Sequence, residues 1–395
     1  MSPQTSADSK PSSGCVRVAV DLTPFAGGGI SGGLKPFVFH LLQWVARERG
    51  DRFSFIYFTR QPLLDEIEAI RRESDWHVCL GTPGDVQGDQ GRKPGLAWAH
   101  DAASTWMDLW PADVLYTPWG FSDFFRPAIP SVNLVADTLH RDWPGLLSAE
   151  EVMRREQWFQ RMLPLAAAVQ CNSEFVARQL RTHFCAPDEK LFVIHNAIQD
   201  GLLSAVSGSP ATLDGKPYFI YPANDWPHKN HERLLKAYAD YRRRAGREAW
   251  DLVLTGHFAR GEAWNLAMAA LGIAGSCRVL GHIERPAYAN LFRNASALVF
   301  PSLYEGFGIP VLEAMSLGVP VACGNLASVP EVAGKAALYF DPRRTSDITA
   351  AMDRMGRDAA LRARLTAAGL ERSKGFSIAR EAGLLADKII SVARG

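Results

Sequence analysis

Short apolar runs alternate with amphipathic stretches along the chain, and glycine or proline separates most of them. In the first half, stretches with helical periodicity lie at 36–49, 148–162 and 173–184. Between them are apolar runs rich in β-branched and aromatic residues, which predict buried strands. These runs are 16–22, 53–60, 114–118, 131–137, 167–173 and 191–196. The alternation predicts a doubly wound sheet of parallel strands.

A second series of the same kind fills the rest of the chain. Its predicted strands are 218–223, 250–256, 277–281, 297–302, 319–323 and 336–340. Between the two series, 201–216 is rich in Ser, Gly and Pro and predicts a linker. We therefore expect a polar tail at 1–14, a first domain at 15–200 and a second at 217–376. An amphipathic helix at 377–395 ends the chain, with a return to the first domain as one option.

Composition narrows the class of protein. A length of 395 residues exceeds one ordinary core, and 43 basic against 42 acidic residues disfavours a general nucleic-acid binder. Six scattered cysteines without a CxxC pair are typical of reduced thiols. The polar start lacks the apolar core of a signal peptide, and no run approaches the roughly 18 apolar residues of a spanning helix. We expect a cytoplasmic protein with at most peripheral membrane contact.

The stretch 301–315, PSLYEGFGIPVLEAM, carries the strongest candidate chemistry. It begins at the end of a predicted strand, and Pro310 suits the first turn of a helix. A helix N-terminus that faces an open loop attracts anions such as phosphate. Glu305 in that loop could accept hydrogen bonds from sugar hydroxyls, and Glu313 could reach a ribose. The E-x7-E spacing by itself equally fits two solvated glutamates with no shared task.

The wider sequence resembles a known family. The segment VFPSLYEGFGIPVLEAMSLGVPVACGNLASVPEVAGKAALYFDP resembles the donor-site segment of the retaining glycosyltransferases of family 4. YPANDWPHKNHERLLKAY (221–238), NSEFVARQL (172–180) and VIHNAI (193–198) resemble further segments of that family. The resemblance implies the α/β GT-B fold, with two facing Rossmann-like domains, parallel sheets and a cleft between them. The first domain would bind the acceptor and the second the nucleotide sugar.

The resemblance also implies site residues. Lys229 takes the place of the family's phosphate lysine, while Glu305 and Glu313 serve the sugar and the ribose. Asp137 and His140 keep their places in a segment often written His-Asp-Leu-x-His, whose first histidine usually lies near the transferred sugar. They could take over that contact or orient the acceptor, and with Glu305 and Lys229 they form the expected catalytic set. The other expected nucleotide-sugar contacts are Gly32, Gly33, His282, Ile283, Gly306, Phe307, Gly308, Ile309, Pro310 and Val311.

The chain departs from the family pattern at two places. Ala136 replaces a histidine, and the region of Asn224 lacks an arginine that would share the phosphate charge. His228 and His231 are three residues apart but have no third ligand at a convincing spacing, so we expect no metal site.

The implied function is the metal-independent, retaining transfer of a hexosyl unit from a nucleotide diphosphate sugar to a glycan or lipid-linked acceptor in surface polysaccharide synthesis. GDP-mannose is the favoured donor and a UDP-hexose the next, with no further cofactor. The alternatives are a GT-B epimerase or hydrolase, and a non-catalytic sugar-nucleotide-binding or scaffolding protein. The aromatic loop 116–127 and arginines 71, 72, 154, 155 and 161 suggest peripheral contact with the inner membrane. The sequence does not choose the sugar, the acceptor or the oligomeric state.

Overall fold

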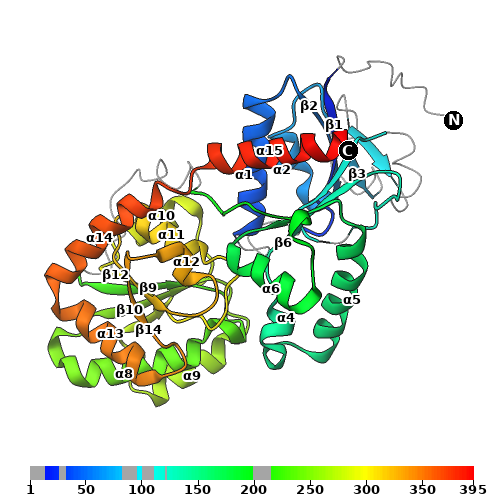
Figure 1. Ribbon diagram of the computed structural model, residues 1–395. Coiled ribbons are helices and arrows are strands. Elements are labelled where there is room, and N and C mark those ends of the chain that lie inside the picture. Colours follow the sequence, from blue (N-terminus) through cyan, green and yellow to red (C-terminus); the bar gives the residue numbers. More distant parts are fainter. Residues whose placement is uncertain (1–13, 26–32, 82–95, 100–110, 121, 199–214) are drawn as a thin grey trace. The chain divides into compact units, whose positions relative to one another are not determined.

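The structure is a computed structural model that describes residues 14–25, 33–81, 96–99, 111–120, 122–198 and 215–395 (Figure 1). Contacts divide the chain into two compact units. Unit 1 comprises residues up to Asn172 together with Val176–His195 and Ile378–Gly395. Unit 2 comprises Ser173–Phe175 and Asn196–Ser377. The predicted tail and most of the predicted linker lie outside the described residues.

Unit 1 is built on an eight-stranded sheet in which every neighbouring pair is parallel. The strand order is β4-β3-β2-β1-β5-β6-β7-β8. The strands are β1 (Val16–Asp21), β2 (Phe53–Arg60), β3 (Trp76–Leu80), β4 (Leu96–Ala99), β5 (Val114–Thr117), β6 (Ser131–Val135), β7 (Ala168–Cys171) and β8 (Leu191–Val193). The α-helices are α1 (Leu34–Glu48), α2 (Leu64–Glu68), α4 (Leu139–Asp142), α5 (Ala149–Leu165), α6 (Glu174–Phe184) and α15 (Ile378–Arg394).

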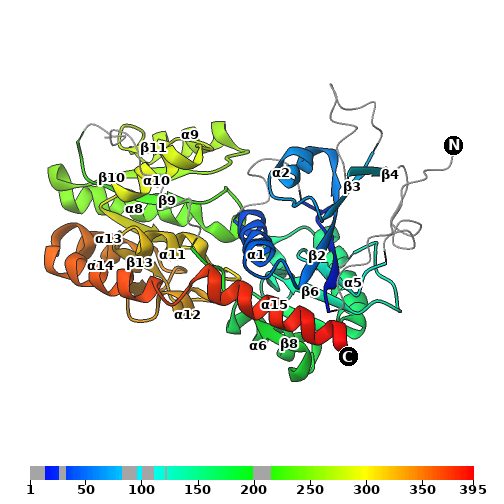
Figure 2. The same cartoon turned by 90° about the horizontal axis from the view of Figure 1, so that it is seen from above.

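The last helix, α15, belongs to unit 1 although it follows unit 2 in the sequence. It packs against α1 and crosses it at a steep angle, as Figures 1 and 2 show. Its apolar face, which includes Leu385 and Ile389, is buried. The Glu381 carboxylate accepts a hydrogen bond from the backbone N–H of His195 at 2.9 Å. The helix therefore completes unit 1.

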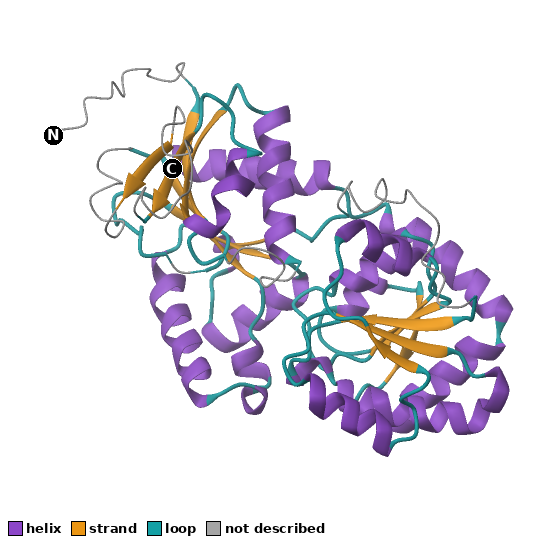
Figure 3. Ribbon diagram, turned by 180° about the vertical axis from the view of Figure 1, so that it is seen from behind, coloured by secondary structure: helices purple, strands orange, loops and turns teal. Residues whose placement is uncertain are grey.

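Unit 2 has a six-stranded parallel sheet in the order β11-β10-β9-β12-β13-β14. Helices cover both faces of this sheet (Figure 3), and α8 packs against α13 while α11 packs against α14. The strands are β9 (Tyr218–Pro222), β10 (Asp251–Thr255), β11 (Cys277–Val279), β12 (Ala297–Phe300), β13 (Val321–Gly324) and β14 (Ala337–Phe340). The helices are α8 (His231–Ala245), α9 (Gly261–Ala270), α10 (Arg285–Arg293), α11 (Ile309–Ser316), α12 (Val329–Ala333), α13 (Thr345–Arg357) and α14 (Ala359–Ser373).

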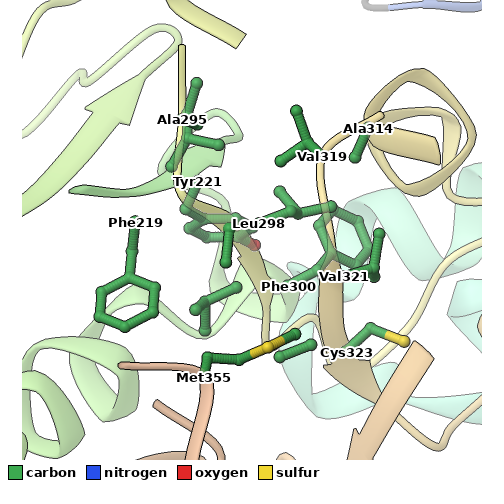
Figure 4. Packing of buried hydrophobic residues seen from close by; sticks show 14 of the residues in the cluster. Phe219, Tyr221, Ala295, Leu298, Phe300, Ala314, Val319, Val321, Cys323 and Met355 are labelled. Carbon is green, nitrogen blue, oxygen red and sulfur yellow. The ribbon is translucent and has the colours of Figure 1, made fainter. Parts of the chain in front are cut away.

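The central strands of unit 2 are buried on both faces, which explains their unbroken apolar runs. Phe219, Leu298 and Val321 from three neighbouring strands pack together with Met355 of α13 (Figure 4). All four residues are essentially fully buried. This packing fixes the strand ends, from which the loops described below emerge.

Candidate functional site

The strand order of unit 2 changes direction between β9 and β12. These strands are parallel neighbours, with Ala297 opposite Phe219 and Leu298 opposite Ile220. In doubly wound sheets, ligands bind outside the carboxyl ends of the two strands at such a switch point. The loop after β9 carries Lys229, and the loop after β12 carries Glu305. The topology alone therefore brings these distant residues to one edge of the sheet.

Asn230 fastens the lysine loop to the glutamate loop. It has a left-handed backbone with φ of 63°, a conformation that Asn tolerates better than most residues. Its buried side-chain amide donates to the backbone carbonyls of Pro301 and Pro342 at 2.9 and 2.8 Å. The backbone N–H of Leu303 donates to the carbonyl of His228 at 2.8 Å. These bonds fix the backbone around Lys229.

Lys229 and Glu305 form an ion pair, with 2.7 Å between Nζ and Oε1. Their side chains are 14% and 10% exposed, so the pair is largely withdrawn from water but still reachable. The Tyr221 hydroxyl donates to the Lys229 carbonyl at 2.7 Å, and the Ser328 hydroxyl donates to the Glu305 carbonyl at 2.8 Å. Burial, with the nearby charge of Glu305, raises the pKa of Tyr221 well above its usual value, so its hydroxyl stays a donor. The two residues predicted for phosphate and sugar are thus held side by side.

The glycine turn after Glu305 leads into α11. Gly308 precedes this helix with φ of 99°, a conformation that favours glycine. Pro310 lies in the first helical turn, as the sequence predicts. The side chains of Phe307 and Val311 are buried in the core of unit 2, and Phe307 packs against the Phe376 ring. Any contact of Phe307 or Val311 with a ligand would therefore come from their backbone groups.

Glu313, in the second turn of α11, has a partner of its own. The Tyr288 hydroxyl of α10 donates to Glu313 Oε2 at 2.6 Å. Burial raises the pKa of Glu313 above its usual value, while the Tyr288 hydrogen bond and the charge of Arg285 act in the opposite direction. The two glutamates of the E-x7-E element therefore have different partners, Lys229 for one and Tyr288 for the other.

The remaining predicted contacts of unit 2 lie between β11 and α10. His282 is exposed, and Ile283 is half-buried against the core. Gly281, just before them, accepts a hydrogen bond from the backbone N–H of Gly256 at 2.9 Å. The sequence prediction did not include Asn230 or Tyr288, because their hydrogen-bond partners lie far away in the sequence.

In unit 1, the predicted residues have structural partners. Asp137 accepts from Arg155 Nη1 at 2.8 Å and from the backbone N–H of Leu139 at 2.9 Å. His140 is 1% exposed, and its ring packs against Phe159 and Phe184. Burial lowers the pKa of His140 to about 4, so it is neutral near pH 7.

These contacts account for Asp137 as part of the packing of unit 1. The His140 ring is buried, and neither of its nitrogens has a hydrogen-bond partner among the described residues. The catalytic roles of Asp137 and His140 stay predictions. Gly33 is exposed and immediately precedes α1, while Gly32 lies outside the described residues.

The arginines suggested for membrane contact are mostly neutralised within unit 1. Arg71 pairs with Glu68, and Arg72 pairs with Asp75. Arg154 and Arg155 both pair with Glu151, and Arg155 also pairs with Asp137. In the aromatic loop, Phe124 is buried, whereas Phe121 lies outside the described residues. Four of the five arginines therefore supply little free positive charge.

The described residues contain neither a membrane-spanning helix nor a cluster of metal ligands. None of the helices among these residues is both long and apolar enough to cross a membrane. In the same part of the chain, no three His, Cys, Asp or Glu side chains gather in a way that could hold a metal ion. His231, one of the two histidines in the lysine loop region, is buried against Tyr221, Phe258 and Trp264.

Comparison with known proteins gives two family matches and several relatives. Residues 31–201 match the family model described as Glycosyltransferase Family 4, and residues 207–372 match the one described as Glycosyl transferases group 1. The chain is 38% identical over 164 residues to the O-antigen chain mannosyltransferase B of Escherichia coli, which is 40% of this chain and 42% of that protein. The match thus spans less than half of that relative.

Solved structures share the fold across nearly the whole chain. A glycosyltransferase from Rickettsia africae aligns with a TM-score of 0.72 at 12% identity, over 96% of this chain and 98% of that one. Anabaena HepE in complex with UDP-glucose aligns with a TM-score of 0.71 at 15% identity, over 95% of this chain and all of that one. The two parallel-sheet units have the GT-B fold, and both family matches, one in each half of the chain, are to glycosyltransferase families.

Proposed function

We propose that this protein transfers a mannosyl unit from a nucleotide diphosphate sugar to a hydroxyl of a glycan or lipid-linked acceptor, with retention of the anomeric configuration. The observation that carries the proposal is the ion pair of Lys229 and Glu305 at the switch point of unit 2, directly before α11. The pair lies at the edge of the sheet where nucleotides bind in this class of fold, which supports Lys229 as the cation for the phosphates and Glu305 as the carboxylate for the sugar.

The charges fit the departure of a nucleoside diphosphate. As the bond from the anomeric carbon to the phosphate oxygen breaks, negative charge grows on the diphosphate. The Lys229 ammonium and the N-terminal amides of α11 stabilise that charge, which is the task that a divalent cation performs elsewhere. Because these groups are fixed positive charges, the proposed reaction needs no metal.

Glu305 serves the sugar in this scheme. Its carboxylate accepts hydrogen bonds from donor hydroxyls and orients the ring beside Lys229. In the proposed same-face displacement, the acceptor hydroxyl attacks the anomeric carbon, and its proton passes to the departing phosphate oxygen. In this scheme Glu305 has no proton to transfer, and its partner is the Lys229 ammonium.

GDP-mannose is the favoured donor. The E. coli relative named above is an O-antigen chain mannosyltransferase, and its match supports both mannose and a surface polysaccharide acceptor. A UDP-hexose is the second choice, since the Anabaena structure holds UDP-glucose. A lipid-linked acceptor would bring the protein to the cytoplasmic face of the inner membrane, and pelleting with anionic liposomes would detect that contact.

One assay distinguishes the proposed function from its rivals. Release of GDP or UDP is measured with a panel of nucleotide sugars, with and without a lipid-linked oligosaccharide acceptor extract. Acceptor-dependent release of GDP from GDP-mannose, with an α-linked product by NMR, is the expected result. Release without acceptor would indicate a hydrolase. Binding without release or epimerisation would indicate a non-catalytic sugar-nucleotide-binding protein.

A further inference from the structure

Three side chains in unit 2 form a small cluster at the start of α10 and the second turn of α11. Arg285, Tyr288 and Glu313 are each partly exposed, so a ligand can approach them. Tyr288 donates to Glu313 Oε2 at 2.6 Å, a short hydrogen bond to a carboxylate. The members are 25 or more residues apart across the two helices, so the fold alone brings them together.

The carboxylate of Glu313 keeps unused acceptor capacity. A carboxylate has about four lone-pair positions on its two oxygens, and Tyr288 uses one of them. Among the residues that the structure describes, none donates a hydrogen bond to Oε1 of Glu313. A pair of neighbouring hydroxyls, such as the 2′- and 3′-hydroxyls of a ribose, would supply two donors to these positions.

Arg285 adds a positive charge to the cluster. Its Nη2 atom is buried and lacks a hydrogen-bond partner within the described part of the chain. Its charge lowers the pKa values of both Glu313 and Tyr288, against the effect of burial. Arg285 therefore favours the ionised form of Glu313, the form that accepts two hydrogen bonds from a diol.

We propose that Tyr288 is the positioning residue for ribose recognition: its hydroxyl fixes the carboxylate of Glu313 so that the free lone pairs meet the ribose hydroxyls of the donor. The inference rests on the proposed function, because it needs a nucleoside diphosphate in unit 2. It goes further by making the ribose preference depend on a residue of another helix.

The test compares affinities for a ribonucleotide and its deoxy counterpart. Calorimetry measures GDP against 2′-deoxy-GDP, or UDP against 2′-deoxy-UDP if the wild-type chain prefers uridine. The wild type should favour the ribonucleotide by roughly tenfold, as expected for one hydrogen bond to a charged group. Tyr288→Phe should reduce that preference to less than threefold and should still bind the deoxy form, which keeps the 3′-hydroxyl. The deoxy form thereby also reports that the variant is folded.

A matched control removes a similar hydroxyl that also forms a hydrogen bond within this region, from Tyr218 of β9 to α10. Tyr218 donates at 2.6 Å to the backbone carbonyl of Leu291 in α10. Tyr218→Phe therefore loosens α10 without touching Glu313, and it should keep the wild-type ribose preference. If Tyr218→Phe abolished the preference as fully as Tyr288→Phe, the effect would be a general one on α10, and the proposal would fail.

The pH profile separates positioning from simple packing. The diol needs the ionised carboxylate, and the Tyr288 hydrogen bond lowers the pKa of Glu313. In Tyr288→Phe, the ribose preference should therefore disappear at a higher pH than in the wild type. Arg285→Gln should shift the profile in the same direction, because it removes the positive charge.

The binding results can refute the role of Tyr288 and the proposed function separately. A wild-type chain that binds GDP or UDP but has no ribose preference refutes the role of Tyr288 and leaves the proposed function standing. A Tyr288→Phe variant that keeps the wild-type preference for the ribonucleotide, with the same dependence on pH, also refutes the role of Tyr288 and leaves the proposed function standing. A wild-type chain that binds neither diphosphate overturns the proposed function, and this inference with it.

Discussion

Glu305→Gln should strengthen the binding of a nucleoside diphosphate while it reduces sugar transfer. In the free protein, the Glu305 carboxylate occupies the Lys229 ammonium at 2.7 Å. A diphosphate must compete with that carboxylate for the same cation. Glutamine keeps the size of the side chain and removes its charge, so Lys229 becomes available to the phosphate. The sugar, in contrast, loses a strong hydrogen-bond acceptor.

The magnitude follows from the geometry of the pair. Two unit charges 2.7 Å apart attract each other by roughly 6 kcal/mol at an effective dielectric constant of about 20, and desolvation offsets most of this. Exposed pairs contribute about 0.2–1 kcal/mol, whereas breaking a buried pair costs about 3–5 kcal/mol. With side chains 14% and 10% exposed, this pair lies between those limits. Removing the competing charge in Glu305→Gln should therefore make diphosphate binding more favourable by about 1–2 kcal/mol, a gain of roughly five- to thirtyfold in affinity.

The assay pairs calorimetry with turnover. GDP affinity is measured for the wild type and for Glu305→Gln, and transfer from GDP-mannose is measured in parallel. Glu371→Gln is the control, because Glu371 pairs with Lys374 at 2.6 Å on the exposed surface of the same unit. The control should change neither quantity. Unchanged or weaker GDP binding by Glu305→Gln would refute the competition between carboxylate and phosphate.

Three further predictions follow from the same structure. Lys229→Met should weaken GDP binding at least tenfold by calorimetry, because the phosphate loses its cation and then faces the unpaired Glu305; unchanged affinity would contradict the assignment. Burial lowers the pKa of both His140 and His231 to about 4, below the ordinary 6.5, so the unfolded chain binds protons more readily as pH falls. The free energy of unfolding measured in urea titrations should therefore fall between about pH 6.5 and pH 4, by up to about 3 kcal/mol per histidine. His140→Phe or His231→Phe should make this free energy depend less on pH. Gly308→Ala should lower the free energy of unfolding by about 1–2 kcal/mol through backbone strain alone, because its nearest contact, Val329, leaves ordinary van der Waals space; a neutral effect in the same titration would contradict this.

The strands of both sheets that have long apolar runs could be predicted from the sequence. All six predicted strands of unit 2 are present, because buried parallel strands such as β9 and β12 consist of apolar residues throughout. Strands β3 and β4 were missed. β3 has a histidine as its second residue, His77, whose ring nitrogens form hydrogen bonds with Glu68 and Thr59 in the folded chain. A run of five residues with an imidazole in it does not indicate a strand without those partners.

The parts of the candidate site whose residues are close in the sequence could be predicted, whereas the parts brought together by packing could not. Glu305 and the turn at Gly308 are neighbours in the sequence, so their motif was visible. Tyr288 and Glu313 are 25 residues apart, in α10 before β12 and in α11 after it. Their contact depends on how these helices pack, so no local sequence pattern indicates it. His140 was assigned from the family resemblance, and its burial against Phe159 and Phe184 depends on packing that no local pattern indicated, so its catalytic role stays a prediction.

Glu305 and Glu313 have separate partners in the structure, Lys229 and Tyr288. If the two carboxylates acted as one acid–base pair, each should perturb the other's charge, but each is engaged elsewhere, by Lys229 and by Tyr288. Their effects on diphosphate binding should then have opposite signs, since Glu305 competes with the phosphate and Glu313 assists the ribose. Residues without a shared partner usually act independently, so the two effects should also add. The separate partners thus support the proposal that the two glutamates serve two parts of one ligand, a scheme in which no proton passes between them.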